Sequence, residues 1–503
     1  METPFSAEVS MGIDLVQPLQ SRPGPARRLH FDRIARAKRR LNLNAYVAMG
    51  LWTLLWMGYN TSWWYLADPN FPANTPDLIH CVRAFFPMLA GWLAVLIIMV
   101  RSSRVLPWVA GPLGLMLVYA VTGLVATVVY LGDPLDGLYY GTNYLAMILV
   151  LLAIVPVENP LADLRRVLNL TWIIGSLMTI GLLGAIPFLS QDQTMAQGGG
   201  ALHMRAYTTV DNIMGMTGTR NTGFARYAAM SALVTLPWLW RKSNRSFRVI
   251  CAAVFLASMY ALVIANGRTE ILGFMISALI ILLAEKSKRT AFLLMGAGAA
   301  VLLALDGFYH GFFVYFTRTG HVDASLTGRT GTWEEAWRFL GNSPVVGLGF
   351  QSDRVYLHTH MHDAFLHVLF QAGIVGGGAM IIALAMVWYY IIKYFFVNKP
   401  ADKSLIPPEI PAIFLFVTIS SITESTFAYF SAAWLLSAPI VPYVMALDRH
   451  MRRLAFDAYR ERTAKVRLAK FYSKNLGPPL DVSPSPPDGE TEVEREPKAD
   501  VSA

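Results

Sequence analysis

The sequence has little charge and almost no cysteine. Only 15% of its 503 residues are charged, whereas 54% are hydrophobic, and the mean hydropathy is +0.43. This composition is too apolar for a soluble protein of this length. The two cysteines, Cys81 and Cys251, fall at opposite faces of the membrane topology predicted below, so they are not expected to form a disulfide.

Several other patterns are missing. The alternation of apolar and polar residues that marks a β-barrel is absent, and no internal repeat is visible. No cleavable signal peptide is apparent, because a polar, basic segment precedes the first apolar run, so we expect the first membrane helix to act as its own insertion signal. The chain also lacks an Asp-x-Asp pair of the kind that holds a divalent ion against a sugar diphosphate.

What the sequence has in abundance is apolar stretches long enough to cross a membrane. They run for roughly 17 to 25 residues, the length that a helix needs to span about 30 Å of hydrocarbon. We therefore predict an all-α polytopic membrane protein with about twelve transmembrane helices. The expected centres lie near residues 55, 90, 119, 147, 179, 231, 256, 277, 299, 380, 418 and 438.

The basic residues indicate the orientation of these helices. If the arm from Arg22 to Arg40 is cytoplasmic, every second loop should also be basic, and the sequence shows this alternation. The loops concerned contain Arg101 and Arg104, Arg165 and Arg166, Arg241 to Arg248, Lys286 to Arg289, Lys393 to Lys403, and Arg449 to Arg453. Both termini are thus expected in the cytoplasm. The topology accounts for most of the net charge of +9, so nucleic acid is not expected as a partner.

The chain divides into three predicted parts: a basic cytoplasmic arm over residues 1–44, a transmembrane domain over 45–447 and a cytoplasmic tail over 448–503. Residues 26–42 of the arm either act only as a topology signal or form an amphipathic helix on the membrane surface. The tail begins with a basic stretch, Arg449 to Lys474, that is expected to follow the anionic inner leaflet. From about residue 478 it is rich in Pro, Asp and Glu, and we predict disorder there.

Three segments on the opposite, external face collect polar residues. One is the loop over about residues 190–222 with Arg220, which Arg226 follows; the second is a tight turn with Arg268. The third and longest covers about residues 307–362, between the ninth and tenth predicted helices. An arginine at the bilayer centre costs on the order of 2.5 to 3.5 kcal/mol unless an anion compensates it. These arginines therefore either mark the membrane boundary by snorkelling or bind something anionic.

The long third segment is predicted to contain a short helix. Thr332 and Glu335 have the spacing of a capping box, and Gly341 to Pro344 would end the helix. One face of this helix carries Trp333, Trp337 and Leu340. Such a helix can lie along the bilayer surface with its tryptophans in the interface.

Histidines gather where this segment enters the next membrane helix. His358, His360 and His362 stand at alternate positions, followed by Asp363. In an extended strand alternate residues share a face, so the three imidazoles can converge on zinc or copper. The sequence offers no acidic or cysteine ligand as an evident fourth partner, which favours a metal-free cationic site with Arg329 instead.

Arginine and histidine together suit one kind of chemistry. Guanidinium groups stay charged and bind phosphate oxygens in a fixed fork, so arginines at a membrane surface suit a lipid-linked diphosphate, which is also a leaving group. A neutral histidine can take a proton from an attacking hydroxyl, and a neighbouring carboxylate can orient or support it. The combination predicts glycosyl transfer.

The motifs between Asn266 and Gly376 are those of a known family. His362 and Asp363 are followed by nine residues and then by Gly373-Ile374-Val375-Gly376. This run is similar to the ligase pattern of His, a small polar residue, nine residues and Gly-x-x-Gly, although Asp363 stands where Asn, Ser or Gln is usual. Arg268 to Leu272 fits an Arg-x-x-x-Leu element. In these respects the chain resembles the O-antigen ligase and O-antigen polymerase superfamily.

Further elements of the resemblance are weaker. "TGRTGTW" fits the loop element that contributes Arg329, and with "THMHDAF" it is closest in wording to the exopolysaccharide polymerase branch. Arg220 ahead of Gly223-Phe224 matches another family arginine. However, Ala225-Arg226-Tyr227 replaces the usual Asn-Pro-Asn, which leaves the role of the loop over residues 190–222 open.

The resemblance implies an inverting glycosyltransferase of the bacterial inner membrane, with a periplasmic active site and no metal or other cofactor. The implied donor is a glycan linked to undecaprenyl diphosphate, and the implied acceptor is another glycan or lipid A core. His362 would activate the acceptor hydroxyl, while Arg268, Arg329 and Arg220 would hold the diphosphate. Asp363 would either raise the basicity of His362 or cap the following helix. Loop or acceptor-side candidates are His360, Arg226, Trp333, Trp337 and Glu424. Membrane lipid and chain-length or export proteins are the other implied partners.

The alternative function is transport of a polysaccharide precursor without bond chemistry. A transporter or flippase is expected to carry charged residues deep in several spans, or broken helices at the midplane. In this sequence the charges lie mostly at the ends of the spans, and Glu424 is the main candidate exception. The sugar, the linkage and the choice between polymerase and ligase stay open.

Overall fold

The computed structural model of the chain describes residues 44–59, 75–155, 160–185, 221–240, 244–265, 267–284, 329–397 and 405–475. Over these residues the protein is helical and contains no strand, so the predicted all-α class is confirmed. The chain divides into two compact units, Met1–Ala446 and Leu447–Ala503, and each is described by itself.

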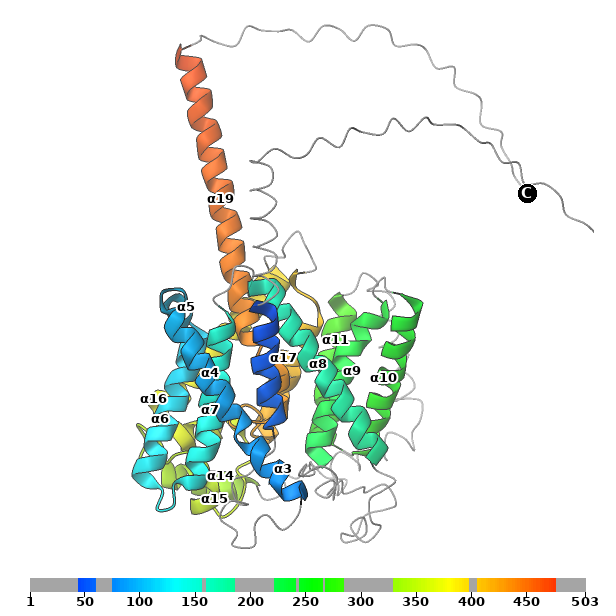
Figure 1. Cartoon of the computed structure of the whole chain (residues 1–503), viewed down its shortest axis with the longest axis vertical. Helices are drawn as coiled ribbons and strands as arrows, with labels where there is room; N and C mark the ends of the chain where they lie inside the picture. Colours follow the sequence, from blue (N-terminus) through cyan, green and yellow to red (C-terminus); the bar gives the residue numbers. More distant parts are fainter. Residues whose placement is uncertain are drawn as a thin grey trace, which may run out of the picture. The chain divides into compact units, whose positions relative to one another are not determined.

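The first unit begins with a helix over residues 44–57. The labelled helices follow in chain order (Figure 1): α3 Thr75–Ala84, α4 Phe86–Val100, α5 Ser102–Val109, α6 Pro112–Tyr130, α7 Leu135–Ile154, α8 Pro160–Ala185, α9 Asn221–Trp240, α10 Arg245–Ile264, α11 Arg268–Ala284, α14 Arg329–Leu340, α15 Ser352–Tyr356, α16 Ala364–Ile391, the π-helix η5 Ile392–Val397, α17 Glu409–Thr423, α18 Ala432–Ser437 and α19 Ile440–Asn475.

Six helical stretches among the described residues are long and apolar enough to cross a membrane: Cys81–Val100, Pro112–Tyr130, Leu135–Ile154, Pro160–Gly184, Arg245–Val263 and Ala364–Val397. They coincide with the spans expected near residues 90, 119, 147, 179, 256 and 380. Helices also cover the expected centres near 55, 231, 277 and 418, but they do not belong to this group. The span near 299 lies outside the described residues. Near 438 the chain forms the short α18 and then α19 in place of one continuous helix.

The helix that follows the histidines, α16, packs closely against α6. A Cβ atom on Gly376 would lie only 2.9 Å from Cβ of Thr122 and 3.3 Å from Cα of Tyr119, both in α6. A larger residue than glycine would therefore separate the two helices. This close approach brings the start of α16 against the interior of the bundle.

The helix α16 is interrupted at Gly373, which has φ 61° and ψ −164°. The break frees backbone groups that a continuous helix would use within itself, and the segment over residues 344–349 pairs with them. Leu348 and Gly349 donate to the carbonyls of Phe370 and Gln371, at 2.8 and 2.9 Å. On the other side of the break, the amides of residues 374 and 375 donate to the carbonyls of residues 344 and 345, at 2.9 and 3.1 Å.

Phe350 anchors this pairing segment in the bundle. Its side chain is 1% exposed, and its ring lies edge-on to Tyr119, with 5.7 Å between the centroids. Its backbone amide donates to Oγ1 of Thr127 in α6 at 2.8 Å. The segment that leads from α14 to the histidines is thus fixed both to α6 and to the break in α16.

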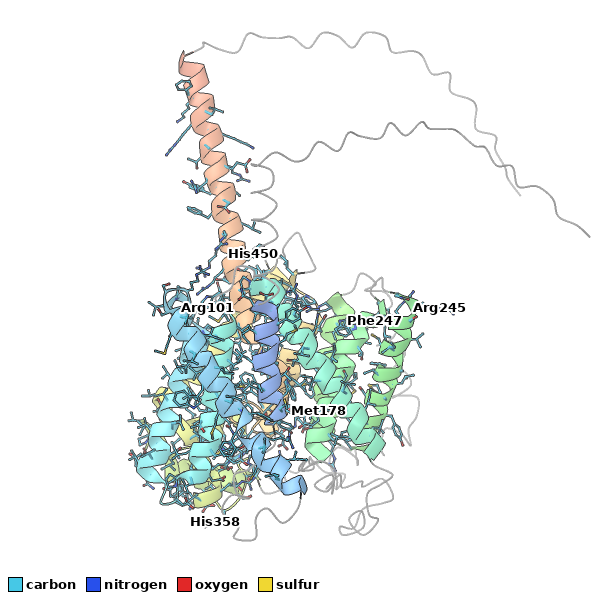
Figure 2. All side chains as sticks on the ribbon, viewed as in Figure 1. Arg101, Met178, Arg245, Phe247, His358 and His450 are labelled. Atoms are coloured by element: carbon cyan, nitrogen blue, oxygen red, sulfur yellow. The ribbon has the colours of Figure 1, made fainter. Side chains whose placement is uncertain are left out.

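Within the first unit, the histidine segment lies at the opposite end of the helices from the described basic residues Arg101 and Arg245. Figure 2 shows Arg101 and Arg245 at one end and His358 at the other. At the end of α8 that carries its basic residues, Arg165 pairs with the fully buried Glu409 of α17 at 2.7 Å. The topology in which the basic loops and the histidines face opposite sides of the membrane stays a prediction.

The second unit is described from residue 447 to 475, as the part of α19 that continues beyond Ala446. Two ion pairs join successive turns of this helix: Arg452 with Asp448 at 2.7 Å, and Lys465 with Glu461 at 2.9 Å. The predicted basic stretch of the tail is therefore helical. The tail from residue 478, the arm before residue 44 and the loop over 190–220 lie outside the described residues.

Candidate active site

The segment before α16 adopts an unusual backbone. His358 and His362 have φ values of 51° and 53°, in the left-handed region that non-glycine residues seldom occupy. Asp363 then caps α16, because its Oδ1 accepts a hydrogen bond from the amide of Leu366 at 2.6 Å. Of the two roles considered for Asp363, capping is the one that the geometry supports. Asp363 thereby fixes the N-terminus of α16, which begins two residues after His362.

His362 and two arginines converge on one carboxylate. Nδ1 of His362 lies 3.3 Å from Oε2 of Glu424, which comes directly after the last residue of α17. Nη2 of Arg226, from α9, lies 3.7 Å from the same oxygen, and Nη2 of Arg329 lies 3.9 Å from Oε1. Arg329 also donates to the carbonyl of Thr423 at 2.7 Å. Four segments far apart in the chain therefore meet at Glu424.

A second carboxylate extends this group towards α11. Nε of Arg226 lies 3.8 Å from Oε1 of Glu270, a residue in the first turn of α11. Arg268 is the first residue of that helix, so it stands two positions from Glu270 at the same helix end. The side chain of Arg226 is 14% exposed and that of Glu270 is 2% exposed. The arginine is thus enclosed between two carboxylates.

Glu424 remains ionised in these surroundings. Burial alone would raise its pKa, but the hydrogen bond with His362 and the charges of Arg226 and Arg329 lower the pKa of Glu424 to about 2. As an ionised carboxylate it can only accept hydrogen bonds. It therefore holds a negative charge between the histidine and the arginines at neutral pH.

A buried polar network lies beside this group. Asp353 of α15 is completely buried, and its Oδ2 lies 3.1 Å from Nδ1 of His360. The hydroxyl of Tyr429 donates to this carboxylate, at 2.9 and 3.0 Å from its two oxygens. The rings of His360 and Tyr429 are stacked, and the ring of His360 lies edge-on to His362 with 4.6 Å between centroids. The two histidines thus have different carboxylate partners.

The network continues into α6 and α16. Tyr119 donates to Oε1 of Gln371, whose Nε2 lies 3.0 Å from Nε2 of His367. The other ring nitrogen of His367 lies 2.8 Å from Oγ of Ser425. Tyr429 is also 3.0 Å from Nε2 of His367. Such a connected set of buried groups fixes the position of His360.

Of the histidines in this network, His360 is neutral at neutral pH. Burial lowers the pKa of His360 to about 4, even though its hydrogen bond with Asp353 acts in the opposite direction. Burial would raise the pKa of Asp353, but the nearby His367 and the hydrogen bond from His360 lower it well below its usual range. At neutral pH a neutral imidazole thus donates to an ionised carboxylate.

Two groups of three side chains could hold a metal ion, because their donor atoms lie within 4.8 Å of one another: Asp353 with His360 and His367, and His360 with His362 and Glu424. The expectation that no acidic ligand accompanies the histidines is therefore wrong. However, two guanidinium groups lie within 4 Å of Glu424, and their charge opposes a cation there. The donor atoms of the other group already contact one another and Tyr429. A metal-free cationic site remains the better prediction.

The predicted loop helix is present as α14, but it begins at Arg329 and not at Thr332. Thr332 therefore stands inside the helix, and the proposed capping box is not formed at that position. Nε1 of Trp333 donates to the carbonyl of Met361 at 2.9 Å, which ties α14 to the histidine segment. Trp337 is 57% exposed. The three residues of the predicted face therefore differ in burial, since Leu340 is buried and Trp333 packs against the same apolar cluster.

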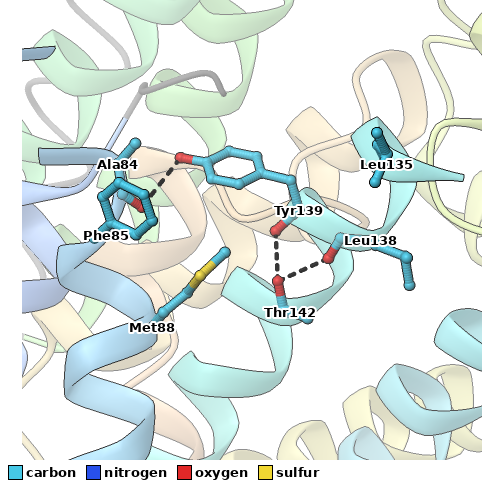
Figure 3. Close-up of a pocket in the computed structure, with 7 residues that line it drawn as sticks. All are labelled: Ala84, Phe85, Met88, Leu135, Leu138, Tyr139 and Thr142. Carbon is cyan, nitrogen blue, oxygen red and sulfur yellow. Dashed lines mark hydrogen bonds between the residues drawn. The ribbon is translucent and has the colours of Figure 1, made fainter. Parts of the chain in front are cut away.

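A cavity of about 290 Å³ lies apart from these residues, between α3, α4 and α7 (Figure 3). Most of the side chains that line it are apolar. Its two hydroxyl groups are already engaged: Tyr139 donates to the carbonyl of Ala84 at 3.4 Å, and Thr142 donates to the carbonyl of Leu138 at 2.7 Å. The cavity offers no charged group for a diphosphate, so we place the chemistry at Glu424 and the histidines.

The structure thus brings together five of the residues predicted from the sequence: His360, His362, Arg226, Arg329 and Glu424. Trp333 contacts the histidine segment through its hydrogen bond to the carbonyl of Met361, and Asp363 caps the helix that follows His362. Arg268 begins α11 two positions before Glu270, and Arg220 lies outside the described residues. The predicted roles of these residues stay proposals.

Sequence reasoning missed His367 and Tyr429 as members of the site, and it considered Glu270 and Asp353 only as carboxylates of the external face that could pair with an arginine. Glu270 stands inside the Arg-x-x-x-Leu element, and His367 lies one helical turn after Asp363, so both could have been found from spacing. Asp353 and Tyr429 are 76 residues apart in the chain, and no local pattern connects them.

The comparisons with known proteins agree with the motifs. Residues 252–381 match a family model described as O-antigen ligase. This range includes Arg268, Arg329, the histidine segment and the break in α16, and it leaves Arg226 and Glu424 outside. A search of curated proteins gives no match. The resemblance recognised in the sequence is therefore confirmed over this part of the chain.

Proposed function

We propose that this membrane protein, whose residues 252–381 match a family model described as O-antigen ligase, is an inverting glycosyltransferase. The proposed donor is a glycan linked to undecaprenyl diphosphate, and the acceptor is a hydroxyl of another glycan or of lipid A core. The reaction would polymerise or ligate a surface polysaccharide such as an exopolysaccharide or O-antigen. We propose that it takes place at the periplasmic face of the bacterial inner membrane, with both termini in the cytoplasm.

The observation that carries this proposal is the meeting of His362, Arg226 and Arg329 around Glu424. Glycosyl transfer from a diphosphate needs a group that accepts a proton and groups that stabilise a leaving anion. The histidine suits the first task, and the guanidinium groups suit the second. All three side chains are partly exposed, at 26%, 14% and 28%, so a substrate can reach them.

In the proposed step, the acceptor oxygen attacks C1 of the donor sugar from the side opposite the diphosphate. A bond forms between that oxygen and C1, and the bond between C1 and the diphosphate oxygen breaks. The electron pair of the broken bond leaves on undecaprenyl diphosphate. The hydroxyl proton passes to Nε2 of His362, because Nδ1 already faces Glu424. This sequence inverts the configuration at C1.

Arginine side chains would hold the diphosphate during this step. Arg226 and Arg329 each lie within 4 Å of Glu424, the carboxylate that His362 contacts, and Arg268 begins α11 two positions before Glu270. We therefore propose Arg226, which the sequence suggested only as a loop candidate, as part of the diphosphate site with Arg268 and Arg329. Arg220 stays a further proposal. Membrane lipid around the donor tail, and chain-length or export proteins, are the remaining proposed partners.

The experiment that tests this function uses the full chain in lipid nanodiscs with an undecaprenyl-diphosphate-linked repeat unit. Growth of the glycan is followed on gels, with and without a lipid A-core acceptor, so that polymerase and ligase activity can be separated. We expect His362→Ala to lower transfer by about 10²- to 10⁴-fold, the usual contribution of a general base. His358→Ala is the matched control, since His358 is exposed and has the same left-handed backbone.

Three outcomes would contradict parts of this function. Equal loss from alanine at His358, His360 and His362, with loss of activity in a chelator, would favour a metal site. Near-native transfer by Arg226→Ala and Arg329→Ala would remove the diphosphate clamp. Movement of the lipid-linked glycan across a vesicle membrane without any product of greater length would favour the transport function.

A further inference from the structure

Glu424 stands between the parts of the site that must act together. Its carboxylate is 9% exposed and lies within 4 Å of His362, Arg226 and Arg329. The contact with His362, at 3.3 Å, is within hydrogen-bond range. The contacts with the arginines, at 3.7 and 3.9 Å, are ion pairs too long for a hydrogen bond. One anion therefore faces both the proposed base and the proposed diphosphate site.

We propose that Glu424 is a positioning residue that couples donor binding to the activation of His362. This inference rests on the proposed function. Without a donor, Glu424 supplies the negative charge between Arg226 and Arg329. When the diphosphate of a donor binds the two arginines in place of Glu424, the carboxylate of Glu424 interacts with His362 only.

The first part of the argument concerns the histidine. An ionised carboxylate can only accept hydrogen bonds, so Nδ1 of His362 must carry the proton that faces Glu424. Nε2 then has a free lone pair and can take the proton of an acceptor hydroxyl. The carboxylate of Asp363 caps α16, whereas the carboxylate that Nδ1 of His362 faces is that of Glu424. Glu424 thus sets the tautomer that the proposed base needs.

The second part concerns charge. An imidazole that takes a proton becomes positive, and two guanidinium groups next to its carboxylate partner disfavour that charge. A diphosphate carries at least two negative charges and binds arginine in a bidentate fork, so it competes well with one carboxylate held at 3.7 to 3.9 Å. Donor binding would therefore release Glu424 from the arginines, so that its carboxylate faces the imidazolium that forms on His362. The base would act efficiently only when a donor is present.

The test is the substitution Glu424→Gln, which keeps the shape of the side chain but removes its charge. The amide group can donate to Nδ1 of His362 and would then place the ring proton on Nε2. We expect transfer to fall by about 10²-fold or more, as for other histidine bases whose carboxylate partner is lost. Binding of inorganic diphosphate, used as the probe, should tighten by about 5-fold, because a competing charge near 4 Å is gone.

This pair of opposite changes separates positioning from a structural role. If Glu424 only holds the fold, both transfer and diphosphate binding should weaken in Glu424→Gln. Glu424→Asp keeps the charge and should recover part of the transfer. Glu334→Gln, which removes an exposed carboxylate from the helix that begins at Arg329, is the control for net charge and should change neither quantity.

A double substitution provides a second measurement. If Glu424 acts through His362, Glu424→Gln should cost no further transfer in a His362→Ala background. Full activity of Glu424→Gln, or an additive loss in the double variant, would overturn this inference while leaving His362 as the base. Retained transfer in His362→Ala would instead overturn the proposed base itself. The two failures are therefore distinguishable.

Discussion

Replacing Gly373 with alanine should destabilise the protein far more than the same change at Gly378, five residues along the same helix. Gly373 has φ 61° and ψ −164°, a conformation that is almost restricted to glycine and costs other residues on the order of 1 to 3 kcal/mol. Its new Cβ would also lie 2.3 Å from the carbonyl oxygen of Val345. By contrast, a Cβ on Gly378 would meet nothing within 4 Å.

The magnitude can be estimated from what must move. To relieve the contact with Val345, the segment over residues 344–349 has to shift, and the two hydrogen bonds to the amides of residues 374 and 375 are then lost or weakened. Each is worth about 0.5 to 1.5 kcal/mol. Together with the backbone cost, Gly373→Ala should lower the free energy of unfolding by about 2 to 6 kcal/mol. Gly378→Ala should be neutral, or stabilising by up to about 1 kcal/mol, since alanine favours a helix interior.

The protein carries a convenient reporter for this measurement. Its two cysteines, Cys81 and Cys251, are buried, so a thiol-reactive dye gains access as the protein unfolds in detergent on heating. The midpoint should fall clearly for Gly373→Ala and stay at or above the wild-type value for Gly378→Ala. Equal midpoints for the two variants would show that the break in α16 is not held as described.

Two further outcomes follow from the site. Trp333→Phe should lower the free energy of unfolding by about 1 kcal/mol, because the hydrogen bond to the carbonyl of Met361 is lost. Trp337→Phe, at an exposed position, should have no effect. The thiol-dye midpoints of the two variants check this, and an equal change in both would contradict it. Acid should destabilise the protein through His360, because the pKa of this residue in the folded protein, about 4, lies below the ordinary value near 6.5. The unfolded chain therefore binds a proton that the folded chain does not, and up to about 3 kcal/mol of stability is lost as the pH falls from 6.5 to 4. Below that range the lowered pKa of Asp353 adds a further loss. The midpoint measured at pH 7.5 and 4.5 should therefore fall less in His360→Gln than in the wild type, and an equal fall would argue against a neutral His360.

Much of the framework was accessible from the sequence because it depends on local patterns. Apolar length predicts the membrane helices, and the histidine segment with Asp363 predicts where α16 begins, with capping by Asp363 as one of two roles considered for that residue. The capping-box spacing of Thr332 and Glu335 predicts a helix that starts at Trp333, whereas the chain is already helical at Arg329, because spacing alone does not show which residue precedes the first turn.

The carboxylates of the site were harder to predict. Glu424 lies 62 residues after His362, and Asp353 pairs with Tyr429 from a separate helix end. Such contacts depend on which helices pack together. In this protein the packing is determined by the small residues where α6 contacts α16 and by the backbone pairing at Gly373. A single sequence carries no spacing that encodes those meetings.

The interruption of α16 also explains the form of the motif that crosses it. The two positions between Gly373 and Gly376 are Ile374 and Val375, and what they give to the neighbouring segment is their backbone amides. Their side chains are 66% and 47% exposed, so almost any apolar residue can stand there without disturbing the pairing. Gly373 and Gly376 must be glycine because a Cβ atom at either position would clash with its neighbours. Ile374 and Val375 are constrained only by the surrounding lipid. A library of substitutions at these four positions should therefore tolerate leucine, methionine or phenylalanine at the inner two, and reject proline there, because proline has no amide hydrogen to donate.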